Sequence, residues 1–227
     1  ISLLNYISTA AVDCPVAVVF GHPSALNFSN TNDFADVGLD LTNALWKEGY
    51  YADLIPSSEI VNGSMFVNTN GRIQYGSQQY SAVVLYKPDY DHTTVVDFFK
   101  KAGATGSTHL YRVGNLATDF EGLPVRDALP ASMQVAGDAG ATAAAVIRAL
   151  KATGVKPQVP GEMRSNTDFP AAVMPKASGQ IQLIDGTVIQ ASGEKDVMGD
   201  PIQTSISIGG IAVEFDAVGV AAIRLDK

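Results

Sequence analysis

The sequence predicts a doubly wound α/β domain with a mostly parallel sheet, followed by a small antiparallel β-rich domain. Three observations lead to this prediction. Short, continuously apolar runs alternate with amphipathic segments of helical length over the first 155 residues. An Asn70-Gly71 pair between two strand-like runs interrupts the alternation with a hairpin. After Val155 the helical pattern stops, and only strand-like segments follow.

The parallel strands are predicted from apolar runs that end at turn residues. They are residues 15–20, 50–55, 80–86 and 108–113. Such unbroken apolar runs are typical of strands that are buried on both faces of a sheet. Between and after them, apolar residues at helical spacing predict helices at 33–48, 93–101 and 138–153. Each predicted helix is stopped by a glycine, at Gly49, Gly103 and Gly154. The β–α–β order predicts right-handed crossovers.

The second domain is predicted from strand-like runs separated by turn signals such as Asp185-Gly186 and Gly209-Gly210. The runs lie at 180–184, 187–191, 204–208, 211–215 and 218–225. We expect them to form one small antiparallel sheet. The stretch 156–161 (KPQVPG) is typical of a linker. The sequence therefore predicts two domains, residues 1–160 and residues 161–227.

Composition and charge exclude several classes of function. Acidic residues outnumber basic ones by 23 to 15, which gives a net charge of −8, and no run of Lys or Arg could bind a phosphate backbone. We therefore expect no nucleic-acid partner. No apolar run is long enough to span a bilayer, so we expect no membrane partner. A single cysteine, Cys14, excludes an internal disulfide and is expected to be a buried packing residue.

Polar side chains that follow the predicted strands are the candidates for a binding crevice, because open α/β sheets bind ligands at the carboxyl ends of their strands. The candidate ligand-binding residues are His22, Asn27, Asp89, Asp91, His92 and Asn115. His92 beside Asp89 or Asp91 could serve as a general base. The alternative is that residues 89–92 (DYDH) cap the following helix and complement its dipole.

The signals of catalysis and of cofactor binding are missing from the sequence. No Gly-x-Ser-x-Gly or Gly-x-Cys-x-Gly nucleophile elbow occurs, and no glycine-rich phosphate loop follows the first strand. With three histidines and one cysteine, we expect no metal site and no cofactor. The run of Asn30, Asn32, Asp33 and Asp36 could bind calcium, but a helix cap explains it better. Asp119 and Glu121 lack a scaffold for a glycosidase carboxylate pair, so we expect no catalytic residues in this chain.

Three segments resemble parts of a known family. They are residues 15–22 (PVAVVFGH), 53–60 (DLIPSSEI) and 80–89 (YSAVVLYKPD), the last followed by a helix that reaches Lys100-Lys101-Ala102-Gly103. This pattern resembles the class I glutamine-amidotransferase-like domains, with a flavodoxin-like fold, that are embedded in multidomain glycoside hydrolases, including the trimerisation domain of β-galactosidases. The resemblance covers roughly residues 15–155. True amidotransferases carry a nucleophilic cysteine after the strand that corresponds to 108–113, whereas this chain continues Gly114-Asn115-Leu116.

The resemblance implies a non-catalytic accessory or oligomerisation module of a larger, secreted glycoside hydrolase. Its partners would then be the other domains of the parent enzyme or further copies of the chain. The residues Tyr75, Tyr80, Tyr86 and Tyr90 are either interface anchors or packing residues. A second hypothesis is a carbohydrate-binding or substrate-shaping domain whose crevice borders a glycan site. A third is a free-standing small hydrolase with a site of another type.

Overall fold

The computed structural model describes residues 11–27, 37–125, 129–157, 179–191, 202–208, 211–217 and 220–225. Its contacts divide the chain into two compact units. The α/β unit comprises Cys14–Leu45 and Tyr51–Lys156, and the second unit comprises the rest of the chain. The predicted domain boundary at residue 160 lies outside the described residues. In the described ranges, no helix has both the length and the hydrophobicity needed to cross a membrane.

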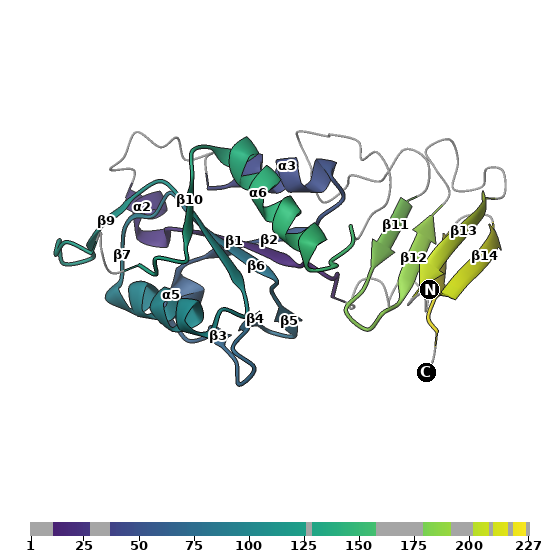
Figure 1. Cartoon of the computed structure of the whole chain (residues 1–227), viewed down its shortest axis with the longest axis horizontal. Coiled ribbons are helices and arrows are strands. Elements are labelled where there is room, and N and C mark those ends of the chain that lie inside the picture. The colour runs from purple at the N-terminus through teal and green to yellow at the C-terminus, as the bar shows by residue number, and fades with distance from the viewer. Residues whose placement is uncertain are drawn as a thin grey trace. The chain divides into compact units, whose positions relative to one another are not determined.

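A five-stranded parallel sheet forms the centre of the α/β unit. Its strands are β1 (Val16–Phe20), β2 (Ala52–Pro56), β6 (Ala82–Tyr86), β8 (His109–Val113) and β10 (Gln134–Ala136). Their spatial order is β2-β1-β6-β8-β10, which is the flavodoxin-like order 2-1-3-4-5 (Figure 1). The predicted fold class is therefore confirmed. The fifth strand was not predicted, because three residues are too few to show a pattern.

The central strands are buried on both faces, as their apolar runs predict. Val16 pairs with Ala52 on one side and with Ala82 on the other, so β1 lies inside the sheet. Four of its five residues and all five residues of β6 are buried. This burial explains why neither strand alternates polar and apolar residues.

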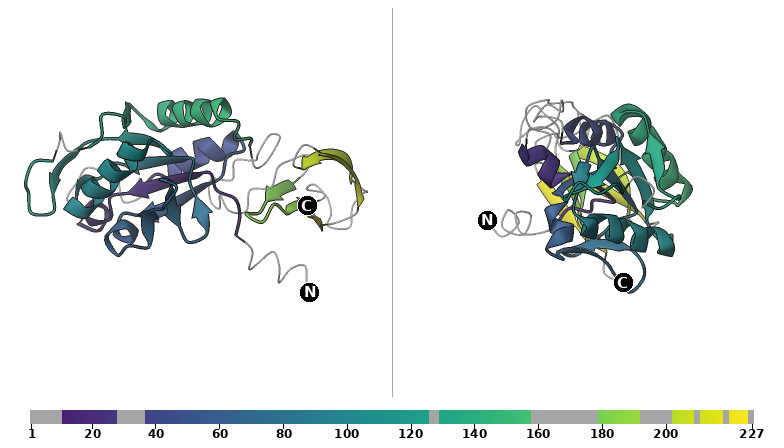
Figure 2. Two further views of the ribbon diagram at one scale, coloured as in Figure 1. Left: turned by 60° about the horizontal axis from the view of Figure 1, so that its bottom comes forward. Right: turned by 90° about the vertical axis from the view of Figure 1, so that its left-hand side faces the viewer.

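Helices cover both faces of the sheet, as expected for a doubly wound fold (Figure 2). The three longest are α3 (Leu39–Lys47), α5 (Thr93–Thr105) and α6 (Ala139–Ala152). Helix α5 packs Val96 and Phe99 against the face of the sheet that presents Val83 and Leu85. Tyr111 of β8 belongs to the other face, where its hydroxyl donates to the Ala145 carbonyl of α6 at 3.4 Å.

Two helix predictions need correction, and two short helices were not predicted. Helix α5 continues past Gly103 and ends at Gly106, which has the left-handed backbone conformation (φ 64°) typical of a C-terminal stop. The helix predicted from residue 33 begins at Leu39, and residues 28–36 lie outside the described part of the chain. Two short helices were not predicted, α2 (His22–Asn27) and α4 (Ser58–Val61). Each is too short to show a helical period.

The inserted hairpin is confirmed. Strand β3 (Met65–Val67) pairs antiparallel with β4 (Ile73–Tyr75), and β4 pairs with the short β5 (Gln78–Gln79). Gly71 in the turn has a φ of 79°, a conformation that favours glycine. Its carbonyl lies 2.8 Å from the Thr105 hydroxyl at the end of α5. The hairpin is thus fixed to the α/β unit.

The second unit is β-rich, as predicted, but its described strands form two sheets. Strands β11 (Gly179–Gln182), β12 (Val188–Ala191) and β15 (Val220–Ile223) make one antiparallel sheet, and β13 (Ile202–Ile208) and β14 (Ile211–Ala217) make a separate hairpin. The prediction of a single sheet was therefore wrong. Turn residues mark the ends of strands, but they do not show which strands pair.

Candidate functional site

The carboxyl ends of β1, β2, β6 and β8 lie at one end of the sheet of the α/β unit because the strands are parallel. Four connections begin there: α2 follows β1, α4 follows β2, and the short strands β7 (Asp89–Asp91) and β9 (Leu116–Asp119) follow β6 and β8. Strands β7 and β9 pair in parallel and form a small second sheet beyond the main one (Figure 1). This end of the sheet is the candidate functional site.

The connections after β1 and β6 are bonded directly to each other. The Ser24 hydroxyl lies within hydrogen-bond distance of the Pro88 carbonyl and 3.1 Å from the Tyr90 carbonyl, and it accepts from the Tyr90 N–H at 3.4 Å. In return, the Tyr90 hydroxyl donates to the Pro23 carbonyl at 3.1 Å. A Cβ on Gly21 would lie 2.5 Å from the Pro88 Cα. The two backbones therefore touch at the switch point between β1 and β6, where this fold class binds ligands.

The backbone after β6 is strained. Lys87 and Asp89 have φ values of 39° and 46°, and among the described residues they are the only non-glycine residues with positive φ. The Lys87 N–H donates to the Val113 carbonyl at the end of β8 at 2.8 Å. Contacts with both neighbouring connections hold this conformation in place. Such strain persists only where the surrounding structure imposes it.

Asp91 is a buried carboxylate with an unsatisfied oxygen. Its side chain is fully buried, Oδ1 accepts the His92 N–H at 2.8 Å, and Oδ2 has no hydrogen-bond partner among the described residues. Burial raises the pKa of Asp91, while the Ser57 hydroxyl, the His92 N–H and the imidazoles of His92 and His22 oppose that rise. Ser57 is buried too, and its Oγ accepts the His22 N–H at 2.9 Å. The structure thus brings Asp91 near both histidines.

The helix-cap interpretation of residues 89–92 is wrong for the two aspartates. Asp89 and Asp91 lie in β7, and α5 begins only at Thr93. His92 occupies the N-cap position, but its side chain accepts no capping hydrogen bond. The carboxylates therefore stand in a strand before the helix and are not in its first turn.

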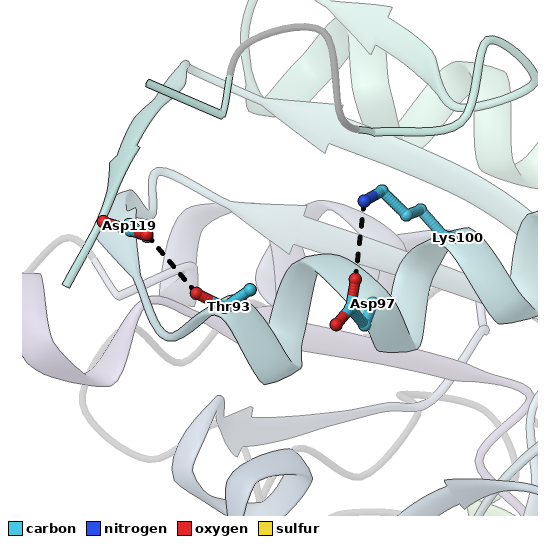
Figure 3. A network of polar contacts seen from close by, with 4 residues as sticks. All are labelled: Thr93, Asp97, Lys100 and Asp119. Carbon is cyan, nitrogen blue, oxygen red and sulfur yellow. Dashed lines mark hydrogen bonds and ion pairs between the residues drawn. The ribbon is translucent and has the colours of Figure 1, made fainter. Parts of the chain in front are cut away.

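Asp119 has a structural role, which Figure 3 shows in part. Its Oδ1 accepts the N–H groups of Glu121 at 3.1 Å and Leu123 at 2.8 Å, and its Oδ2 lies 3.4 Å from the Thr93 hydroxyl at the start of α5. The side chain is 6% exposed. The carboxylate closes the turn after β9 and ties it to the helix, so it is not available to pair with Glu121 in catalysis.

Phe120 is an exposed aromatic residue that was not among the predicted site residues. It is 53% exposed, and its ring stacks on the imidazole of His92 with 4.7 Å between centroids and 9° between planes. The Tyr90 ring lies 6.2 Å away. The signal was present in residues 119–124 (DFEGLP), where turn residues surround a large aromatic side chain that would be expected to face the solvent.

The other predicted site residues lie on β7, on α2 and between β8 and β9. Asp89 pairs in register with Leu116 of β9. Asn115 is exposed between β8 and β9, and Asn27 is the last residue of α2. Among the described residues, no group of three or more His, Cys, Asp or Glu side chains is placed to hold a metal ion. The Asn30–Asp36 run lies outside them.

Hydroxyl and thiol groups near the sheet are not placed as nucleophiles. Ser24 and Ser57 are buried and hydrogen-bonded to backbone groups. Cys14 carries a buried thiol and precedes β1, at the amino end of the sheet. After β8 the chain continues Gly114-Asn115-Leu116, without a serine or cysteine elbow. Ser24, Ser57 and Cys14 are therefore not exposed nucleophiles.

Comparison with known proteins gives a partial likeness to a solved structure. No family model matches this sequence, and no curated protein matches it. A search of solved structures finds a likeness to the apo exo-carrageenase GH42 from Bacteroides ovatus, at a TM-score of 0.45 and 12% sequence identity. The likeness covers 92% of this chain and 28% of the carrageenase chain. This chain therefore spans less than a third of that enzyme's length.

Proposed function

We propose that this chain is a non-catalytic accessory module of a larger, secreted glycoside hydrolase, where it contacts other domains or further copies of itself. We infer the absence of catalysis from the direct packing of the Gly21 and Pro88 backbones at the switch point of the sheet, where this fold class binds its ligands. Ser24 and Tyr90 add hydrogen bonds across the same junction. A substrate that entered between β1 and β6 would have to break these contacts.

The parent enzyme is proposed from the sequence resemblance. The domains that this sequence resembles are embedded in multidomain glycoside hydrolases, and the position of their amidotransferase nucleophile is occupied here by Gly114-Asn115-Leu116. A module without this nucleophile would have to serve the enzyme in a way other than amidotransferase chemistry. Contact with the rest of the enzyme is such a purpose.

The contact surface that we propose is formed by exposed side chains of the hairpin and α4. Tyr80 and Tyr86 are 0% and 1% exposed inside the α/β unit, so the packing alternative is correct for these two tyrosines. Phe66 in β3 and Val61 in α4 are instead 43% and 39% exposed. Exposed aromatic and aliphatic side chains on a rigid surface are the usual anchors of protein interfaces.

The test combines assembly with turnover. The native gene product, and the same product carrying Phe66→Asp, are compared by light scattering after size-exclusion chromatography. We expect Phe66→Asp to weaken subunit association or the docking of this module, and we expect Glu121→Gln, an exposed control in another part of the unit, to leave both unchanged. An assembly that Phe66→Asp does not affect would argue against this surface. Turnover of glycosides, esters or amides by the isolated chain would contradict the non-catalytic proposal and support a free-standing hydrolase.

A second candidate function is carbohydrate binding at the carboxyl end of the sheet. The observation that favours it is the exposed Phe120 ring, which is stacked on His92 beside the polar groups of β7 and β9. An accessory module and a carbohydrate-binding module are compatible in one chain, because the hairpin surface and the Phe120 ring belong to different elements.

A further inference from the structure

Phe120 combines high exposure with a fixed position. A free phenyl side chain at a turn would rotate, but this ring lies parallel to the His92 imidazole at a centroid distance of 4.7 Å. One face of the ring is covered by the imidazole. Despite this stacking, Phe120 is 53% exposed, so the ring is also accessible from solvent.

The turn that carries Phe120 is closed by its own hydrogen bonds. The Asp119 N–H donates to the Leu123 carbonyl at 2.8 Å, and the Gly122 N–H donates to the Asp119 carbonyl at 3.1 Å. The Asp119 carboxylate accepts two more N–H groups from the turn and lies near the Thr93 hydroxyl. The ring is therefore ordered before any ligand arrives, which reduces the entropy that binding would cost.

The turn that carries the ring holds an exposed acidic residue. Glu121 follows Phe120 and is exposed, and the apolar Leu123 in the same turn is 63% exposed. The whole chain carries a net charge of −8. These charges disfavour an anionic ligand at the ring, whereas carboxylates accept hydrogen bonds well from neutral hydroxyl groups.

We infer that the outer face of Phe120, backed by His92 and flanked by Glu121, is a binding platform for the apolar face of a neutral saccharide ring. A pyranose presents C–H groups on one face and hydroxyl groups at its rim, which matches an exposed aromatic ring with the Glu121 carboxylate next to it in the chain. The inference rests on the second candidate function above and adds to it the residue, the ligand class and the exclusion of sulfated or uronic saccharides.

The test is calorimetric titration of the chain with tetrasaccharides from cellulose, xylan and galactan, and with sulfated and uronic tetrasaccharides as anionic probes. At least one neutral probe should bind saturably, and the anionic probes should bind more weakly. Phe120→Ala should weaken binding by about tenfold or more, and Phe120→Tyr should keep it within about threefold. Leu123→Ala is the matched control, because Leu123 is 63% exposed in the same turn and lies outside the stack; binding should not change.

Several results would overturn the inference. These are no binding of any neutral tetrasaccharide, equal binding by Phe120→Ala and the wild-type chain, or tighter binding of the anionic probes. Circular dichroism and urea unfolding of Phe120→Ala establish that any loss is not loss of fold. Light scattering of the same variant separates this inference from the assembly proposal: if Phe120→Ala disrupts assembly and no saccharide binds, the ring is a protein contact and the saccharide platform is wrong.

Discussion

Replacing Asp91 by Asn should stabilise the α/β unit at neutral pH, although most substitutions of buried polar residues destabilise proteins. The carboxylate is fully buried, and its Oδ2 has no hydrogen-bond partner among the described residues. In the Asn variant, Oδ1 still accepts the His92 N–H, and a neutral NH₂ group replaces the Oδ2 oxygen. Burying a charge costs several kcal/mol, and leaving a neutral polar group unpaired costs about 1–3 kcal/mol. For Asp91, the His92 N–H, the Ser57 hydroxyl and the two imidazoles recover part of the cost of burying the charge.

The expected gain is about 1–2 kcal/mol at pH 7, or roughly 3–6 °C in melting temperature. Its pH dependence has a definite sign. Burial raises the folded-state pKa of Asp91 above its ordinary value of 3.8, so the stability that this group contributes is complete below that value and is lost as the pH rises through the folded-state pKa. The advantage of the Asp91→Asn variant over the wild type should therefore be small near pH 4 and grow toward pH 7.

Urea unfolding followed by circular dichroism, for the wild-type chain and Asp91→Asn between about pH 4 and pH 7, measures this difference. Asp119→Asn is the matched control, because its carboxylate accepts two backbone N–H groups and loses charge-assisted hydrogen bonds in the variant. It should destabilise by about 1 kcal/mol at pH 7. Destabilisation by Asp91→Asn at pH 7, or an advantage that does not grow with pH, would refute the account of Asp91.

Three further predictions concern packing and burial. Gly21→Ala should destabilise the unit by about 1–3 kcal/mol in urea unfolding, because its Cβ would lie 2.5 Å from the Pro88 Cα; an unchanged midpoint would mean that the two connections are not in contact. Tyr80→Phe should cost about 1–2 kcal/mol in the same assay, because it removes the 2.7 Å hydrogen bond to the Asp53 carboxylate, and a neutral effect would contradict that bond. The Cys14 thiol is 8% exposed, so it should react with a thiol reagent slowly in the native chain and rapidly in urea; fast native reaction would contradict its burial.

Most of the fold could be predicted because its signals are local. The apolar runs of β1 and β6 show their burial directly, and Asn70-Gly71 predicts its hairpin from turn chemistry alone. Short elements without an apolar run, such as α2 and β7, show no period and were missed. The separation of the β13–β14 hairpin from the sheet of β11, β12 and β15 depends on contacts between strands that are distant in the sequence, which sequence patterns do not encode.

Part of the candidate site could be predicted from the sequence, whereas the rest depends on contacts between distant residues. Its position at the carboxyl ends of the strands follows from topology, and Asp91, His92 and His22 do lie near one another. The hydrogen bonds of Ser24 to the connection after β6 join residues more than sixty positions apart. The stack of Phe120 on His92 likewise depends on the pairing of β7 with β9. Contacts of this kind become visible only once the chain is folded.

The central claim is that this chain belongs to a larger glycoside hydrolase as an accessory module. The most direct test is the intact mass of the native gene product, isolated from its source with an antibody raised against this chain. The account predicts a mass several times the 23.8 kDa of these 227 residues, together with glycoside hydrolase activity in the isolated product. A mass near 23.8 kDa would contradict it and establish a free-standing protein.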